Sequence, residues 1–325
     1  MLKKIKGTIG AERRAALAAA FTCLSLIGAH SAARGAVSLS DNAANSAYSG
    51  GVWTTGTNGG SGFSSWYLVP DVSQSGVNQA ATWGFDTESA ANVFATTANP
   101  NINTNGVAWA LWSQNGTGTD SVAQTAYRGF NYALVSGATF SIDMTTDAVG
   151  TQGAEGFQLQ NYNPSTNYAT PILEVAAFGT GNDYSVSWGG YDSTSLGFAN
   201  SQTSTISSVH DGTSTGNNGN GIQITVTLTS SDTANVTLTP LNSTIQPESL
   251  SSLTLNNLPI NQLALFNDNL GSTYQADYFN NINITDPVST PEPPSWILLA
   301  GLLAVPLLGR YGRRTGPLNT ATGGD

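Results

Sequence analysis

The sequence has 325 residues, of which 39% are hydrophobic and 9% charged, and its formal net charge is −10. Arg128 is the only lysine or arginine between Val37 and Thr290, whereas 17 of the 20 acidic residues lie in that span, so its charge is about −16 (1 minus 17). A protein that binds nucleic acid needs cationic side chains to replace the counterions of the phosphates. This composition therefore excludes nucleic acid as a partner.

The N-terminal segment has the features of a secretory signal peptide. Several lysines and arginines precede an unbroken run of apolar or small residues from Ala15 to Ala29, which is too short for a comfortable membrane span. Small residues follow and offer cleavage at about Ala33 to Ala36, so we expect a signal peptide over residues 1–33. Its removal would take away Cys23, the only cysteine, and leave a mature protein without disulfides.

Residues 37–286 are expected to form one domain built from β-strands. The clearest strand is Ile222–Thr229, where apolar and polar residues alternate as they do in a strand with one buried face. A turn-forming sequence, 230–232, follows it, and the alternation resumes in Asn235–Thr239, which predicts a hairpin. Other segments with a strand pattern are 83–85, 107–112, 140–144, 157–159, 173–178, 184–188, 253–258, 263–266 and 278–284.

About ten short strands without a sustained helical period predict an all-β fold. A sheet with one apolar face must bury that face against a second sheet, so we expect an antiparallel, jelly-roll-like β-sandwich. The order of the strands at 140–144 and 156–159, the hairpin, and the segments 265–269 and 277–285 resembles the concanavalin A-like jelly-roll sandwiches. That family includes lectins, glycan hydrolases and domains without a ligand, so the resemblance implies a fold and leaves the function open.

One pair of carboxyl groups is a candidate for catalysis. Asp86 and Glu88 are two residues apart, so a strand would present both on one face, and glycan hydrolysis uses two carboxyl groups about 5 to 9.5 Å apart. The pair lacks the third acid of the jelly-roll hydrolase strand that it resembles, and the mature protein has a single histidine, His210, in a polar loop. We therefore predict a protein that is not an enzyme, with hydrolysis at Asp86 and Glu88 as the alternative.

Candidates for ligand binding are also few. Trp112 should lie on the strand face opposite Trp109 and precedes polar residues, which favours contact with a glycan, unless a second core covers that face. Asp268 and Asp277 belong to segments that supply the oxygen ligands that Ca²⁺ prefers. Their spacing matches no calcium loop, so we expect ordinary turns there and no cofactor, with calcium as the alternative.

The C-terminal residues 287–325 combine a proline-rich segment, an apolar run over 296–308, and Arg310, Arg313 and Arg314. As a helix the apolar run would reach roughly 20 to 25 Å, which is less than the ~30 Å of a bilayer core. The arginines would lie among the lipid headgroups on the cytoplasmic side and leave the rest of the chain outside. We therefore expect this segment to be an anchor in the inner membrane.

Three features in this order, Pro291-Glu292-Pro293, the apolar run and the arginines, resemble the PEP-CTERM sorting signal of Gram-negative bacteria. The resemblance implies recognition and cleavage by an exosortase-like protease, and it associates the exported protein with exopolysaccharide and biofilm. The chain departs from the usual pattern through Pro294 and through the residues 315–325 that follow the arginines.

These observations predict a protein that is first anchored in the cell envelope and then found at the cell surface or outside the cell. We expect a structural or glycan-binding component of the extracellular matrix. The two alternatives are an extracellular glycoside hydrolase of jelly-roll type and a surface domain without a ligand.

Overall fold

A computed structural model describes residues 38–51, 53–73, 82–88, 102–114, 121–146, 153–178, 183–192, 197–207, 221–241, 246–269 and 274–287. They belong to one compact unit, residues 36–287. The predicted signal peptide, the sorting segment and His210 lie outside the described residues. Among the residues that are described, no helix is long and apolar enough to cross a bilayer.

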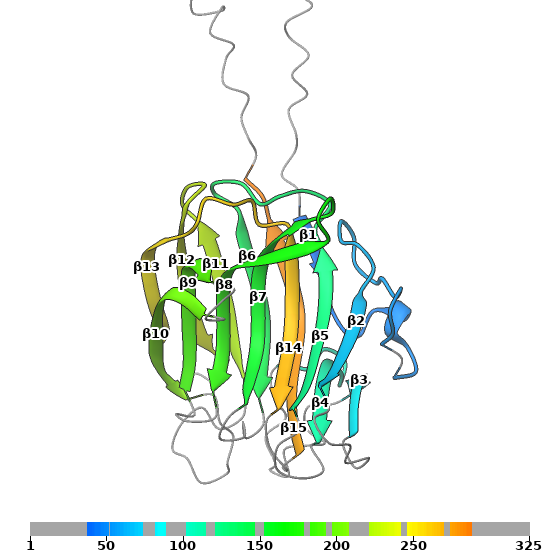
Figure 1. Cartoon of the computed structure of the whole chain (residues 1–325). Coiled ribbons are helices and arrows are strands. Elements are labelled where there is room, and N and C mark those ends of the chain that lie inside the picture. Colours follow the sequence, from blue (N-terminus) through cyan, green and yellow to red (C-terminus); the bar gives the residue numbers. More distant parts are fainter. Residues whose placement is uncertain are drawn as a thin grey trace, which may run out of the picture. The chain divides into compact units, whose positions relative to one another are not determined.

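Two antiparallel sheets face each other, one in front of the other in Figure 1. The seven-stranded sheet has the order β10 (Gly197–Ser207), β9 (Asp183–Asp192), β8 (Tyr168–Phe178), β7 (Ala154–Asn163), β14 (Gln262–Asn269), β5 (Ser121–Gly129) and β2 (Tyr67–Ser73). The eight-stranded sheet has the order β13 (Glu248–Thr254), β12 (Thr233–Pro240), β11 (Ile222–Leu228), β6 (Thr139–Thr146), β15 (Tyr274–Thr285), β4 (Ala108–Gln114) and β3 (Thr82–Glu88). In the same sheet, β1 (Ser38–Asp41) pairs with the second half of β15. The predicted antiparallel, jelly-roll-like sandwich is confirmed.

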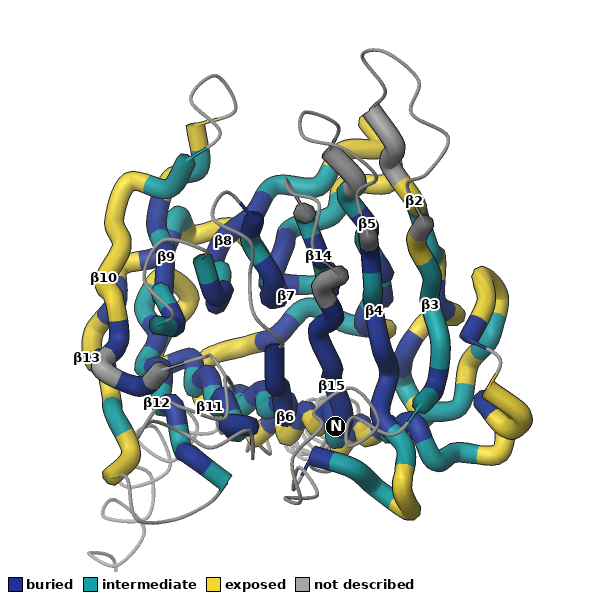
Figure 2. The backbone as a smooth tube through the Cα atoms, turned by 90° about the horizontal axis from the view of Figure 1, so that it is seen from below, coloured by how far each residue is buried: buried dark blue, intermediate teal, exposed yellow. Residues whose placement is uncertain are grey.

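The core lies between the sheets and takes residues from both of them. Figure 2 shows buried positions along the central strands of both layers. The ring of Phe140 in the eight-stranded sheet lies 5.6 Å from that of Phe157 in the seven-stranded sheet. In β11 and β12 every second residue is buried, as predicted for the hairpin, and Val226 pairs with Val236. Each such apolar side chain stabilises the fold by about 1.5 to 3 kcal/mol when it is fully buried. The alternation of apolar residues along the strands therefore favours packing of the two sheets against each other.

Several strands differ from those expected from the sequence. The strands β1, β2, β5 and β10 were not predicted, and the strand expected at 253–258 instead spans Glu248–Thr254. β10 is an edge strand rich in serine, threonine and asparagine, so it carries little apolar alternation. β2, at the other edge of its sheet, contains Pro70, a residue that a central strand would not tolerate.

The segment that follows β1 contributes a cluster of aromatic rings around a buried ion pair. It includes the short 3₁₀ helix η1 (Ser46–Tyr48). The guanidinium of Arg128 on β5 donates to the carboxylate of Asp41 on β1, and neither side chain is exposed to solvent. The guanidinium also lies 4.5 Å from the ring centre of Phe63 and 4.8 Å from that of Trp66. Arg128 therefore joins the first strand and the segment after it to the seven-stranded sheet.

Candidate functional site

The outer face of the seven-stranded sheet, turned away from the other sheet, has two adjoining hollows. One, of about 340 Å³, is lined by residues that include Tyr127, Gln158, Glu174, Phe266 and Asp268. The other, of about 480 Å³, shares Tyr127 with it. Its lining residues are Ser64, Ser65, Tyr67, Val69, Tyr127, Gly129, Tyr162, Asn167, Ala169 and Gln262. We call the two hollows together the outer-face groove.

Strand pairing places the residues of the groove in one row across the sheet. Tyr127 pairs with Tyr67 on one side and with Ala264 on the other, and Gln158 pairs with Ala264 and Glu174. Five strands at a spacing of about 4.8 Å make this row about 19 Å long. The groove is therefore long enough for an extended ligand that crosses the strands.

Small residues keep the middle of the row open. Ala264 lies between the tyrosines and Gln158, and Gly156 and Ala176 are paired in the adjoining row. A Cβ atom at Gly156 would lie 2.2 Å from the carbonyl oxygen of Val175, so the close approach of β7 and β8 excludes any side chain there. The hollow is thus a consequence of the sequence of these strands.

One half of the groove is aromatic. The rings of Tyr67 and Tyr127 stack with their centres 6.4 Å apart and their planes at 28°. Tyr67 is 60% exposed, so much of this ring is accessible to a ligand. Nearby, the hydroxyl of Tyr162 donates to Asn167 Oδ1 at 2.9 Å. This half therefore offers exposed aromatic surface with polar groups beside it.

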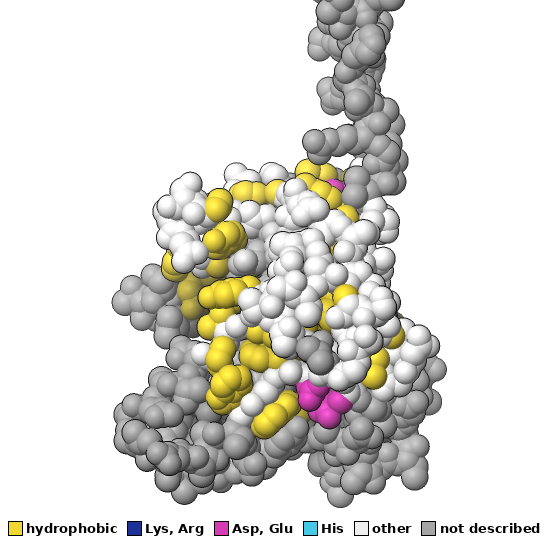
Figure 3. Space-filling model, turned by 90° about the vertical axis from the view of Figure 1, so that its right-hand side faces the viewer, with side chains coloured by type: hydrophobic (Ala, Val, Ile, Leu, Met, Phe, Trp, Pro, Cys, Tyr) yellow, Lys and Arg dark blue, Asp and Glu magenta, His cyan; other side chains and the backbone are white. Residues whose placement is uncertain are grey.

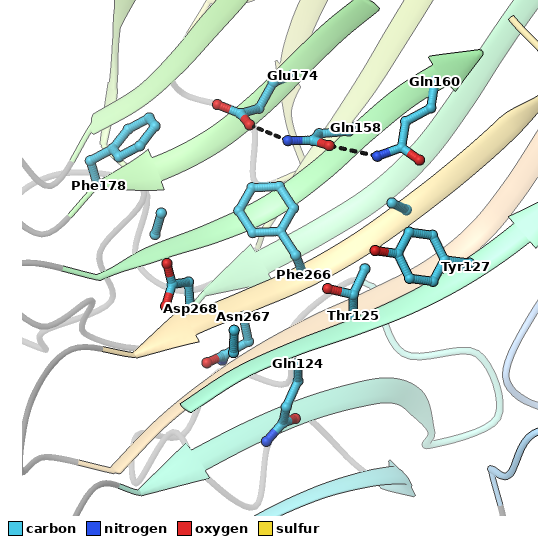
Figure 4. Close-up of a pocket in the computed structure, with 13 residues that line it drawn as sticks. Gln124, Thr125, Tyr127, Gln158, Gln160, Glu174, Phe178, Phe266, Asn267 and Asp268 are labelled. Atoms are coloured by element: carbon cyan, nitrogen blue, oxygen red, sulfur yellow. Dashed lines mark hydrogen bonds between the residues drawn. The ribbon is translucent and has the colours of Figure 1, made fainter. Parts of the chain in front are cut away.

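The other half is polar, and its side chains are joined in a chain of hydrogen bonds (Figure 4). Gln160 Nε2 donates to Gln158 Oε1 at 2.6 Å, and Gln158 Nε2 donates to Glu174 Oε2 at 2.7 Å. Burial raises the pKa of Glu174, and the hydrogen bond from Gln158 opposes this rise because it stabilises the carboxylate. The chain holds the carboxyl group in a fixed place beside Phe266.

The carboxyl groups of the groove are too far apart for two-carboxylate hydrolysis. Asp268 pairs with Ala154, which pairs with Phe178 on β8, so two strand spacings separate Asp268 from β8. Glu174 lies four residues before Phe178 on that strand. The backbone positions of Glu174 and Asp268 are therefore about 13 Å apart along the strands and about 10 Å apart across them. Two-carboxylate hydrolysis uses carboxyl groups about 5 to 9.5 Å apart, and Glu174 and Asp268 do not provide that spacing.

The predicted pair Asp86 and Glu88 lies elsewhere, on the outer face of the eight-stranded sheet. As expected, both occupy one face of β3, since Thr87 between them pairs with the buried Trp109. Asp86 Oδ1 accepts from the amide of Thr87 at 2.9 Å, and Glu88 Oε1 accepts from the Tyr278 hydroxyl at 3.4 Å. Burial, followed by the charge of Asp86, raises the pKa of Glu88. Neither residue lines the groove.

Trp112 also lies on the outer face of the eight-stranded sheet. It packs against a second, smaller apolar cluster and is half-buried. A Cβ atom at Gly84 would lie 2.5 Å from its indole, so the ring covers that glycine on β3. The cluster consists of Ile102, Ala108, Ala110, Ala276 and Tyr278. Trp112 thus packs on this cluster with part of its surface exposed, and its contact with a glycan stays a prediction.

The structure separates the two proposed calcium ligands. Asp268 lines the outer-face groove, whereas Asp277 is fully buried between the sheets, where its Oδ1 accepts from Asn267 Nδ2 at 3.3 Å. The carboxyl group of Asp277, on β15 of the eight-stranded sheet, and that of Asp268 therefore lie on opposite sides of the seven-stranded sheet. Within the described ranges, no group of three or more histidine, cysteine or acidic residues could hold a metal ion.

No protein-family model matches this sequence, and no curated protein matches it. Among solved structures, a legume lectin-like domain from Entamoeba histolytica is 9% identical with a TM-score of 0.36, and the match covers 68% of this chain and 90% of that one. Arcelin-5, a lectin-like defense protein from Phaseolus vulgaris, is 10% identical with a TM-score of 0.33, over 68% of this chain and 92% of that one. The Crh5 transglycosylase is 11% identical with a TM-score of 0.37, over 68% and 84%. Similarities of this size do not show the function of this chain.

Proposed function

We propose that this protein is an exported surface or extracellular-matrix component that binds glycan in the outer-face groove. The observation that supports this function best is the accessible Tyr67–Tyr127 stack in one row with Gln158 and Glu174. A sugar ring has an apolar face of C–H groups and a rim of hydroxyls. Tyrosine rings pack against the C–H face, and amide and carboxyl groups form hydrogen bonds with the hydroxyls.

The sequence supports export and sorting as part of the same proposal. The signal peptide precedes the sandwich, and the segment at 291–314, with its similarity to PEP-CTERM signals, follows it. The domain between them has no cysteine and a low content of charge, as suits a protein that remains soluble through hydroxyl and amide groups. An exosortase-like protease would process the tail, and the released domain would act within exopolysaccharide.

We expect Tyr67→Ala and Tyr127→Ala to weaken binding to a soluble polysaccharide about tenfold or more, since a residue at the centre of a binding site contributes more than about 1.4 kcal/mol. A glycan array would select the polysaccharide, and isothermal titration calorimetry would measure the affinity of each variant. The matched control is Trp83→Ala, because Trp83 is also exposed but lies on β3, outside the groove. Unchanged affinity in both tyrosine variants would contradict this assignment of the site.

The unaltered protein and two further variants test the enzyme alternative. Release of reducing ends from a polysaccharide by the unaltered protein, lost in Asp86→Asn or Glu88→Gln, would favour hydrolysis over binding as the function.

The sorting proposal predicts that deletion of residues 296–308 releases the protein into the medium or stops its processing. This run is the apolar part of the segment that resembles the sorting signal. Fractionation of cells into medium, envelope and cytoplasm, followed by immunoblotting, would measure the change. Identical fractionation of the shortened and unaltered proteins would mean that the segment does not direct sorting.

A further inference from the structure

We infer that the outer-face groove selects glycans that present hydrogen-bond donors and carry no anionic groups, so that neutral and amino-sugar polymers bind and sulfated or uronate-bearing polymers do not. This inference rests on the glycan-binding function proposed above and specifies its class of ligand.

Two hydrogen-bond acceptors in the groove lack donors. Gln160 and Gln262 are paired on neighbouring strands, and each lines one of the two hollows. The two residues are only 5% and 9% exposed, and within the described part of the chain the Oε1 atom of each has no hydrogen-bond partner. A buried acceptor without a hydrogen-bond partner costs free energy. A ligand that donates a hydrogen bond to these oxygens therefore binds more tightly than one that brings further acceptors.

The carboxylate of Glu174 explains why these oxygens are presented. A carboxylate only accepts hydrogen bonds, so Gln158 must turn its amide nitrogen toward Glu174 and its oxygen toward Gln160. Gln160 then uses its nitrogen to donate to Gln158, which leaves its own oxygen without a donor (Figure 4). The direction of this chain of hydrogen bonds is thus set by Glu174, and it makes this half of the groove rich in hydrogen-bond acceptors.

The charge of the groove also disfavours anionic ligands. Its acidic residues are Glu174 and Asp268, and the one cation of the described residues, Arg128, is fully buried against Asp41. Seen from the side of β2 and β3, the described surface has hydrophobic and uncharged polar side chains with a small acidic patch, and no lysine or arginine (Figure 3). An anionic polymer would therefore meet repulsion without a compensating positive charge, within a screening length of about 8 Å at physiological salt.

The test compares two pairs of polymers that differ in charge, and the members of the first pair also share a backbone. The protein would be titrated at low and at physiological salt with a neutral dextran and dextran sulfate, and with chitosan and alginate oligomers. We expect at least tenfold tighter binding of dextran than of dextran sulfate, and measurable binding of chitosan but not of alginate.

Two groove variants and a control connect the selectivity to these residues. Glu174→Gln should lower the affinity for chitosan several-fold more than that for dextran, because it removes a negative charge and frees the direction of the amide chain. Asp268→Lys, at a partly exposed position, should raise the affinity for dextran sulfate. Asp232→Asn, in the exposed turn between β11 and β12, should change neither affinity.

The outcomes separate this inference from the function on which it rests. Binding of dextran sulfate or alginate as tight as that of the neutral polymer would overturn the selectivity and leave glycan binding intact. Failure of every polymer to bind would overturn both. If the affinity of folded Asp268→Lys for dextran sulfate equals that of the unaltered protein, the electrostatic argument is overturned, even if Glu174→Gln does not fold.

Discussion

Replacement of Arg128 with methionine is expected to lower the free energy of unfolding by about 3 to 5 kcal/mol, because it leaves the carboxylate of Asp41 buried without a cation. The guanidinium also donates to the carbonyl oxygen of Ser64 at 3.2 Å and to Asn58 Oδ1 at 2.7 Å, and both acceptors would lose it. The rings of Phe63 and Trp66 would lose their cation–π contacts as well.

Chemical denaturation would measure this effect, and for a domain of this size thermal melting should shift by about 10 °C. The double variant Arg128→Met with Asp41→Leu should recover part of the loss, because it removes both charges and leaves an apolar contact. Asp232→Asn, an exposed acid, serves as the control and should change stability by less than about 0.5 kcal/mol. A change as small as the control's in Arg128→Met would show that the ion pair is not needed for the fold.

Arg128 also explains why the aromatic half of the groove could not be predicted from the sequence. In β5 the residues that face the core are Gln124, Ala126 and Arg128, whereas the outward face carries Thr125 and Tyr127. The usual pattern is thus inverted, with a charge inside and an aromatic ring outside. Hydrophobic alternation cannot identify such a strand, and tertiary contacts with Asp41, Phe63 and Trp66 are needed to bury its arginine.

The polar half of the groove was within reach of sequence reasoning. The alternation of Phe157 and Leu159 with Gln158 and Gln160 already places both glutamines on one face of a strand, and the structure confirms it. The partner of that face was not predictable, because Glu174 is joined to Gln158 by the register of β7 and β8. Local pattern thus gave the fold class and the faces of the central strands, whereas the site depends on which strands pair.

A second large effect is expected at the acid cluster buried between the sheets. Asn267 Nδ2 donates to Glu155 Oε1 and to Asp277 Oδ1, each at 3.3 Å, and Asn267 Oδ1 accepts from Ser113 at 2.8 Å. Asp277 Oδ2 has no hydrogen-bond partner among the described residues. Burial raises the pKa of Asp277 well above its usual range, because the charged form loses its hydration. The folded protein therefore holds a proton on Asp277 at pH values where the unfolded chain has released it.

The sign of the pH dependence follows from this difference. Because the pKa of Asp277 is higher in the folded state, its contribution to stability is fully present below the unfolded pKa of about 4. Above that pH the contribution falls by about 1.4 kcal/mol per pH unit, and it is lost once the pH has risen through the folded pKa. Asp277→Asn keeps an oxygen to accept from Asn267 and removes the titrating group. Its free energy of unfolding should rise relative to that of the unaltered protein by the same slope.

Urea denaturation of both proteins at pH 4.5, 6 and 7.5 would measure that difference. Burial also raises the pKa values of Asp143 and Glu174, but both residues remain in the variant, so their contributions cancel when the two proteins are compared at each pH. Asp232→Asn, an exposed replacement outside this cluster, is the control variant. If the difference between Asp277→Asn and the unaltered protein stays constant across this range, Asp277 does not hold a proton in the folded state and the cluster must be stabilised in another way.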